Sequence, residues 1–162
     1  MVDIWNKQKR SEVMSLIRSR GNKATEMRLI EIFREYGITG WRRNQPLIGK
    51  PDFIFRREKV AVFVDGCFWH GCPKCYKRPG SNQEFWDTKV FTNRKRDRLV
   101  NRELRKAEWK VVRIWQHQLK SSSRVARTVK RVLEARTLVS RIEASNPVAS
   151  DDNKQQTSLY YD

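Results

Sequence analysis

The chain has 162 residues, of which 35 are Lys or Arg and 18 are Asp or Glu, giving a formal net charge of +17 at pH 7. This length suits one domain with its own hydrophobic core and leaves little room for a second. Such an excess of positive charge indicates a polyanionic partner. Because the charge is interleaved with tryptophan, we expect nucleic acid rather than a merely basic, soluble surface.

The sequence also limits where the protein acts. No stretch approaches the roughly 20 apolar residues that cross a membrane, and Met1–Arg20 is too polar for a secretory signal. We therefore expect a cytoplasmic protein with no membrane partner. All three cysteines fall within nine residues, from Cys67 to Cys75. An odd number of cysteines at this spacing cannot form a complete set of disulfides, which favours a metal site.

The N-terminal segment, residues 1–22, contains a predicted short helix at Ser11–Arg18 among basic side chains. It is either a frayed amphipathic helix or an arm that closes over nucleic acid. A clearer helix is predicted over Ala24–Tyr36, where apolar residues recur at helical spacing and Gly37 provides the C-cap.

Glu26 lies on the apolar side of this second helix, three and four residues before Leu29 and Ile30. A carboxylate that faces a core is unfavourable unless it is paired or contacts the water shell of a metal ion. The alternative is that Glu26 only complements the helix dipole at the first turn. The sequence leaves both interpretations open.

Three strands are predicted in the middle of the chain. Trp41–Asn44 has the pattern of an edge strand, whereas Asp52–Phe55 and Val60–Val64 are joined by a short charged turn and form a predicted β-hairpin. The second strand of the hairpin is apolar at every position, which is typical of a central strand buried on both faces. Asp52 begins one strand and Asp65 follows the other, so the hairpin is expected to bring the two carboxylates together.

The second half of the chain is predicted to form helix, strand and helix. A strongly basic helix spans Glu84–Glu108, followed by a strand at Trp109–Trp115 and a last helix over Arg124–Ile142. A solvated helix face explains most of the basic residues. Residues 143–162 are polar, and we expect a disordered tail. The predicted fold is an α/β sandwich in which helices flank a small mixed central sheet. The candidate DNA contacts on the basic helix are Arg94, Lys95 and Arg98.

The cysteines form a knuckle with the spacing of a zinc site, and a closed tetrahedral site needs a fourth ligand beside Cys67, Cys72 and Cys75. Both histidines are candidates. His70 lies inside the cysteine cluster, whereas His117 follows the last predicted strand and would join the knuckle to the sheet. Four ligands crowded into the local segment would strain its backbone, so the spacing favours His117. A closed Cys3His site has a structural role.

Taken together, the motifs resemble those of the very-short-patch repair (Vsr) endonucleases, which are DNA mismatch endonucleases of the restriction-endonuclease-like superfamily. The resemblance covers about residues 8–120, and FVDGCFWHGC is its most specific part. It implies a Vsr-like nuclease domain over residues 23–142 with a structural zinc knuckle, and residues 1–22 as a DNA-contacting arm. The matching motifs, in chain order, are KATEMRL, GKPDF, VFVDGCFWHGC, EFW, the basic helix with RDR, and WKVVRIW.

The resemblance also implies an activity: a magnesium-dependent nick in one strand of double-stranded DNA beside a T:G mismatch, the product of 5-methylcytosine deamination. It implies that the Asp52 carboxylate and the main-chain carbonyl of Val64 bind magnesium. His70 acts on the attacking water and is thereby removed from the zinc site, and Glu26 contacts the water shell of the metal. The zinc ligands implied are Cys67, Cys72, Cys75 and His117, and the aromatic wedges that open the DNA stack are Phe68, Trp69 and Trp86.

Two departures from the family pattern concern Asp65. The wider superfamily has an acid followed two residues later by lysine, but here Cys67 occupies that position. Vsr-like enzymes share this absence and use the histidine instead. Some members carry histidine where this chain has Asp65, and cysteine where it has His117. Asp65 is a candidate catalytic residue, and the sequence leaves open whether it binds metal directly.

Two alternative functions are compatible with these features. The first is a Vsr-like nuclease that serves restriction or phage defence and has no mismatch preference. The second is a zinc-containing DNA-binding module without catalysis, against which the acidic residues and His70 argue together. Mismatch-repair proteins are candidate partners. We expect a monomer, because nicking one strand needs only one active site.

Overall fold

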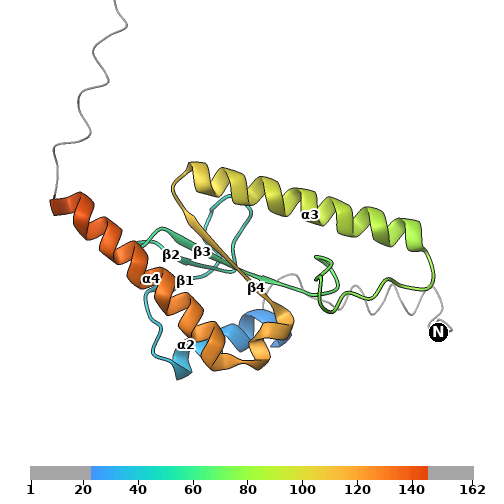
Figure 1. The fold of residues 1–162 in the computed structure, drawn as a ribbon, viewed down its shortest axis with the longest axis horizontal. Helices are drawn as coiled ribbons and strands as arrows, with labels where there is room; N and C mark the ends of the chain where they lie inside the picture. Colours follow the sequence, from blue (N-terminus) through green and yellow to red (C-terminus); the bar gives the residue numbers. More distant parts are fainter. Residues whose placement is uncertain (1–22, 146–162) are drawn as a thin grey trace, which may run out of the picture.

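The computed structural model describes residues 23–145 of the chain (Figure 1). The predicted helix at Ser11–Arg18, the proposed arm and the tail beyond residue 145 therefore lie outside the described residues. Within the described part, no helix is both long enough and apolar enough to cross a membrane.

The protein is an α/β fold around one mixed sheet of four strands in the order β1-β2-β3-β4. Strand β2 pairs antiparallel with both β1 and β3, whereas β4 lies parallel to β3. The sequence prediction of a small mixed sheet flanked by helices is thus confirmed. The elements are η1 (Lys23–Met27), α2 (Arg28–Glu35), β1 (Trp41–Arg42), β2 (Phe53–Phe55), β3 (Val60–Asp65), α3 (Gln83–Lys106), β4 (Lys110–Trp115), η2 (Gln116–Lys120) and α4 (Ser122–Ser145).

The elements differ from the prediction mainly at their ends. The first predicted helix begins as a π-helical turn, η1, before α2 continues to Glu35, and Gly37 follows with a positive φ of 62°, as a C-cap glycine does. The edge strand is shorter than predicted. Helix α4 begins at Ser122 and continues to Ser145, so the first residues of the expected tail are helical.

Helices cover both faces of the sheet, α3 on one side and α2 with α4 on the other (Figure 1). Side chains of a strand alternate between the faces. Val60 and Val62 of β3 therefore pack in the core beneath α2 and α4, whereas Ala61 and Phe63 pack against Val100 and Leu104 of α3. The same alternation directs Asp65, the last residue of β3, toward α3. The sheet thus presents a carboxylate to the basic helix.

Candidate active site

The four predicted zinc ligands come together at the end of the sheet. Cys67, Cys72 and Cys75 lie on the loop after β3, and His117 lies on η2, which follows the neighbouring strand β4. Their ligand atoms all lie within 4.8 Å of one another. The Sγ atoms lie 3.3, 3.6 and 3.4 Å from Nδ1 of His117, in the order of the cysteines. His70 is not part of this cluster, as the strain argument anticipated.

These donors fit a tetrahedral zinc ion. Zinc bonds of about 2.3 Å to sulfur and about 2.0 Å to nitrogen require a separation of about 3.5 Å between the sulfur and nitrogen ligands, and the distances above agree. Hydrogen bonds with Cys67 and Cys72 raise the pKa of the Cys75 thiol to about 12, because crowded thiols cannot all ionise. A cation at the centre would remove this conflict.

Helix α3 holds the loop that carries His70. Asn93, a buried side chain, donates from Nδ2 to the carbonyl of Trp69 at 2.8 Å. Arg94 donates from Nε to the carbonyl of His70 at 3.2 Å and from Nη2 to the carbonyl of Gly71. Gly71 has a positive φ of 61°, and a Cβ there would meet Val90 at 2.5 Å. Arg94, predicted as a DNA contact, thus has its guanidinium engaged with the protein backbone.

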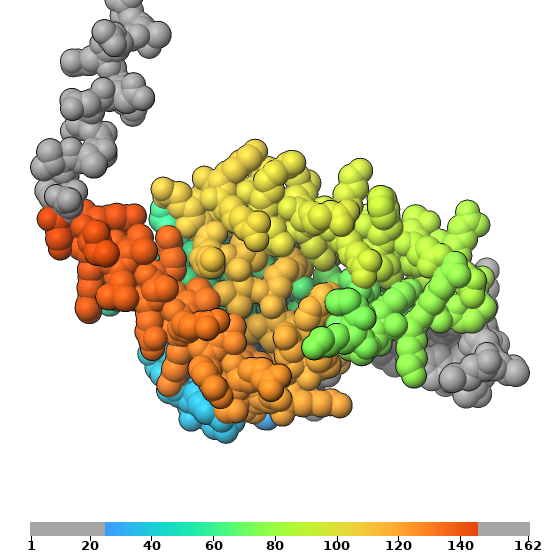
Figure 2. Space-filling view, viewed as in Figure 1, coloured from blue at the N-terminus to red at the C-terminus, as the bar shows by residue number. Residues whose placement is uncertain are grey.

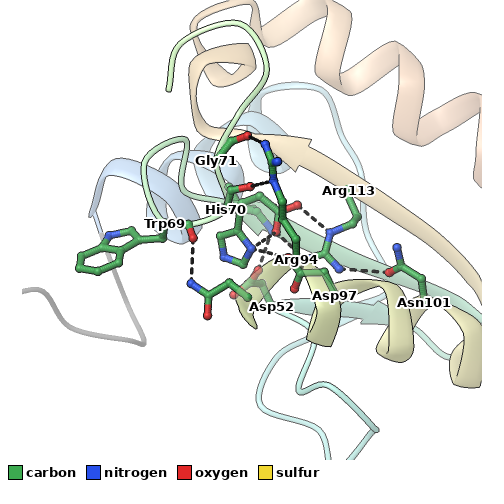
Figure 3. Close-up of polar contacts among 11 residues, drawn as sticks. Asp52, Trp69, His70, Gly71, Arg94, Asp97, Asn101 and Arg113 are labelled. Carbon is green, nitrogen blue, oxygen red and sulfur yellow. Dashed lines mark hydrogen bonds and ion pairs between the residues drawn. The ribbon is translucent and has the colours of Figure 1, made fainter. Parts of the chain in front are cut away.

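The imidazole of His70 points from this loop toward α3 (Figure 3). Its Nδ1 lies 2.6 Å from Oδ2 of Asp97, and 3.8 Å from Oδ1 of Asp65. Burial alone would raise the pKa of Asp97, but the hydrogen bond and charge of His70, together with Arg113, bring it below its usual value. The ionised carboxylate can only accept, so Nδ1 of His70 carries the proton in this hydrogen bond, and in the neutral imidazole Nε2 is then the acceptor.

Arg113 of β4 binds the other carboxylate of this group. Its Nε and Nη2 donate to Oδ2 and Oδ1 of Asp65 at 2.6 and 2.7 Å, and Nη2 also lies 3.0 Å from Oδ1 of Asp97. Nη1 donates to Oδ1 of Asn101 at 3.1 Å. Asp65 and Asp97 are therefore joined by one guanidinium, as Figure 3 shows for Arg113 and its neighbours.

Asp52 lies beside the end of β3, as the hairpin prediction required. The backbone N–H of Val64 donates to Oδ2 of Asp52 at 2.7 Å. Burial raises the pKa of Asp52 to about 6, with further increases from the charges of Glu26 and Asp65, while the Val64 hydrogen bond and Arg113 oppose the shift. Among residues 23–145, no cationic side chain forms an ion pair with Asp52.

The Val64 carbonyl faces the same space as the Asp52 carboxylate. The N–H and C=O of one strand residue point to the same neighbouring strand, and the Val64 N–H points to Asp52. The register Phe53↔Val62, extended by two residues, brings Pro51 opposite Val64. Proline has no N–H to donate to that carbonyl. Two oxygen donors of the kind that magnesium prefers therefore lie together.

Glu26 approaches the same region from η1. It is 5% exposed and accepts an ion-paired hydrogen bond from Nη2 of Arg43, just after β1. Its negative charge contributes to the raised pKa of Asp52. The structure thus provides the paired carboxylate that the sequence left as one of its alternatives.

The three predicted aromatic wedges form one cluster. The ring of Phe68 lies 5.3 Å from that of Trp69 and 5.0 Å from that of Trp86. Trp86 is only 7% exposed, whereas Phe68 and Trp69 are half-buried. The ring of Trp69 points away from His70 in Figure 3. Trp86 thus has the environment of a packed residue that supports the other two rings.

Sequence reasoning assigned no role to Asp97, Arg113 or Arg43. Two of them nonetheless stand out in the sequence. Asp97 is a single acid inside a run of basic residues, and Arg113 is a charge at an alternate position of an otherwise apolar strand. Arg43 does not, because its partner Glu26 lies 17 residues away on another element.

Comparison with known proteins agrees with this geometry. The profile of the family described as DNA mismatch endonuclease Vsr matches residues 2–77. The Type II nicking enzyme V.NmeAIP of Neisseria meningitidis is 35% identical over 142 residues, which cover 83% of this chain and 99% of that protein. The DNA mismatch endonuclease Vsr of Escherichia coli is 32% identical over 127 residues, 77% of this chain and 80% of that protein.

A shorter match has higher identity. The Type II nicking enzyme V.NaeI of Lentzea aerocolonigenes is 49% identical over 69 residues, so this chain spans only 42% of that protein's length. The fold, the site and these matches define a DNA endonuclease, a hydrolase that acts on DNA. The chain belongs to the Vsr family of endonucleases. Nucleases of this family normally need a divalent metal ion.

The two histidines are expected to separate in a zinc assay. His117→Ala removes a ligand of the cluster and is expected to lower bound zinc from one ion per chain to near zero and to destabilise the fold. His70→Ala is the matched control and is expected to retain zinc. Metal content of the purified variants by mass spectrometry measures both. Loss of zinc from the His70 variant would show that His70, and not His117, is the fourth zinc ligand.

Asp52 is expected to make stability depend on pH. The unfolded carboxyl titrates near pH ~4 and the folded one near about 6, so between these values the native state holds a proton that the unfolded state has lost. Stability without added magnesium therefore falls as pH rises through this window. Asp52→Asn keeps the acceptor for the Val64 N–H and carries no charge.

We expect the Asp52→Asn variant to be more stable than the wild type by about 1–3 kcal/mol at pH 7.5. The difference should approach zero at the acid end of the window. Urea unfolding of both proteins at the two pH values measures it. An equal difference at both would contradict the burial of an ionised carboxylate at this position.

Proposed function

We propose that this protein is a magnesium-dependent endonuclease of restriction-endonuclease-like architecture that nicks one strand of double-stranded DNA, acting as a monomer. One observation carries the proposal: the Asp52 carboxylate and Val64 carbonyl lie at the same end of β3 as His70, whose ring is oriented by Asp97. Two oxygen atoms suited to magnesium and an imidazole suited to proton transfer thus lie at one end of the same strand.

The roles of the residues follow from their environments. Asp52 and the Val64 carbonyl would hold magnesium, which supplies Lewis-acid stabilisation of the charge that develops on the scissile phosphate. His70, with Nδ1–H bound to Asp97, presents Nε2 to the attacking water and accepts its proton. Glu26, held by Arg43, would accept a hydrogen bond from water bound to that metal. Cys67, Cys72, Cys75 and His117 would hold zinc with all four positions filled by protein ligands, which gives the ion a structural role in fixing the loop that carries His70.

The basic side of α3 supports a path for the DNA backbone. Its side chains project along one long edge of the molecule (Figure 2). A depression of about 550 Å³ there is lined by Arg98, Asn101, Arg102, Arg105 and Lys106. Glu103 pairs with two of these cations, which leaves positive charge in excess. Lys95 and Arg98, both exposed, remain proposed phosphate contacts, and Arg94 acts by holding the His70 loop.

Mismatch preference is the finer part of the proposal. The E. coli relative is named a DNA mismatch endonuclease, and we propose a T:G pair as the target, in the repair of deaminated 5-methylcytosine. Phe68 and Trp69 would open the stack beside the mismatch, supported from beneath by Trp86. A mismatched pair opens at lower cost than a paired one, which gives a physical reason for the preference. Mismatch-repair proteins are proposed as partners on the same reasoning.

We also propose an alternative function, because several relatives are named Type II nicking enzymes. In that case the protein would nick DNA in a restriction or defence setting without preferring mismatches. The difference lies in the substrate and not in the chemistry of the site.

One cleavage assay distinguishes these functions. Duplexes that differ only by T:G in place of T:A are incubated with zinc-loaded protein, with and without magnesium. We expect a nick in one strand that requires magnesium and is at least about tenfold faster on T:G, because unpairing the mismatch saves about 1.4 kcal/mol or more. His70→Ala is expected to bind DNA and not cut it. Equal rates on both duplexes would support the restriction or defence function. Binding of DNA without any cleavage would support a non-catalytic DNA-binding module.

The aromatic cluster is expected to carry the preference. Replacing both Phe68 and Trp69 by alanine removes stacking worth about 1–3 kcal/mol per base, so the ratio of T:G to T:A cleavage rates should fall about tenfold or more. Phe91→Ala is the matched control, since this ring is 61% exposed on α3 and lies outside the aromatic cluster described above. An unchanged ratio in the double variant would remove the wedge from the mechanism.

A further inference from the structure

The guanidinium of Arg113 forms ion pairs with both carboxylates beside His70, Asp65 and Asp97. In the parallel register Phe63 lies opposite Arg113, two residues before Asp65. Alternation along the two strands puts all three side chains on the α3 side of the sheet. The cation also lies over the Phe63 ring, 4.7 Å from its centroid. Packing and register thus fix where the guanidinium sits.

The two carboxylates are bound in different ways. Asp65 gives both oxygens to Arg113, in the forked geometry that only arginine provides. Asp97 gives Oδ1 to Arg113 and Oδ2 to His70 Nδ1. Oδ1 of Asp65 lies 3.8 Å from the same Nδ1, which is beyond hydrogen-bond range. Arg113 therefore decides which carboxylate binds the imidazole.

We propose that Arg113 is a positioning residue that engages Asp65 fully and orients Asp97, so that Asp97 alone fixes the His70 ring. It follows that Asp65 anchors Arg113 and is not a magnesium ligand, which leaves Asp52 as the metal-binding carboxylate of this pair of strands. The inference rests on the proposed function for its effect on cutting. The contacts themselves do not depend on that function.

Arg113 binds the side chains of Asp65, Asp97 and Asn101 at once, and lysine could not replace it. A lysine ammonium is a single nitrogen, so it cannot donate at once to both oxygens of Asp65, to Asp97 and to Asn101. The side chains of Asp65, Asp97 and Arg113 are 6, 17 and 19% exposed. Because these side chains are largely buried, water cannot easily replace the hydrogen bonds of the guanidinium. We therefore expect the loss of those bonds to change the orientation of Asp97 and, through it, of the His70 ring.

A first experiment observes His70 without DNA. The chain has two histidines, and His117 lies in the cysteine cluster, so the remaining imidazole signals in a long-range ¹H–¹⁵N spectrum of the zinc-loaded protein belong to His70. We expect one tautomer, protonated at Nδ1, in the wild type and exchange between tautomers in Arg113→Lys. Arg127→Lys, an exposed arginine on α4, is the matched control. A wild-type spectrum from Arg113→Lys would overturn the proposal.

A second experiment measures cleavage. Loss of a group that orients a reactive side chain lowers turnover about 10–100-fold, so Arg113→Lys should reduce kcat by this factor while KM for DNA stays within about threefold. The Arg127 variant should match the wild type. A raised KM with unchanged kcat would mean that Arg113 binds DNA directly, contrary to the proposal.

A third experiment tests Asp65. Asp65→Asn and the double variant Asp65→Asn with Arg113→Met are compared with Arg113→Lys; the double change removes both charges of the Asp65–Arg113 pair, so neither is left without the other. Retained zinc shows that each variant folds. We expect the double variant to be no slower than the slower single variant, and the magnesium concentration for half-maximal cutting to stay within about twofold of wild type.

A tenfold or larger rise in that magnesium concentration for Asp65→Asn would make Asp65 a metal ligand and overturn the proposal. If the wild type cuts no duplex at all, the proposed function fails, and the imidazole spectrum alone then decides the role of Arg113. The two failures are therefore distinguishable.

Discussion

The structure depends on compensating the negative charge that gathers at the end of β3. Four carboxylates approach this point, and their repulsion in a partly buried setting must be offset by cations. Arg113 offsets Asp65 and Asp97, and Arg43 offsets Glu26. Among residues 23–145, no cationic side chain forms an ion pair with Asp52, which accepts the backbone N–H of Val64, and burial raises its pKa to about 6. Of these four carboxylates, Asp52 is thus the one that fits the proposed magnesium ion.

The sheet makes this arrangement possible. Antiparallel pairing of β2 with β3 places Asp52 beside Val64, and parallel pairing of β3 with β4 places Arg113 beside Asp65. A slip of one residue in either register would turn these side chains to the opposite face, into the core beneath α2 and α4. The apolar residues of β3 on both faces prevent such a slip, because each core fixes its own set. Core packing on both faces of β3 therefore fixes the register that brings Asp52 beside Val64 and Arg113 beside Asp65.

The loop after β3, which carries His70, is attached to the rest of the fold at two places. The Cys3His cluster joins it to η2, while Asn93 and Arg94 hold its carbonyls from α3. Gly71 allows the sharp turn between these attachments. The Cys3His cluster, which could hold zinc, and the side chains of Asn93 and Arg94 thus fix this loop from two sides.

The sequence by itself determined the local parts: the hairpin with Asp52 at its start, the buried strand Val60–Val64, the cysteine knuckle and the basic helix. Each is visible because periodicity, spacing and charge are properties of neighbouring residues. Only the tertiary structure decided the partners of those parts. Asp97 and Arg113 meet Asp65 because α3 and β4 pack on one side of the sheet, and Trp86 is buried because the knuckle loop folds over it. Such pairings depend on contacts between segments distant in sequence, which no local pattern encodes.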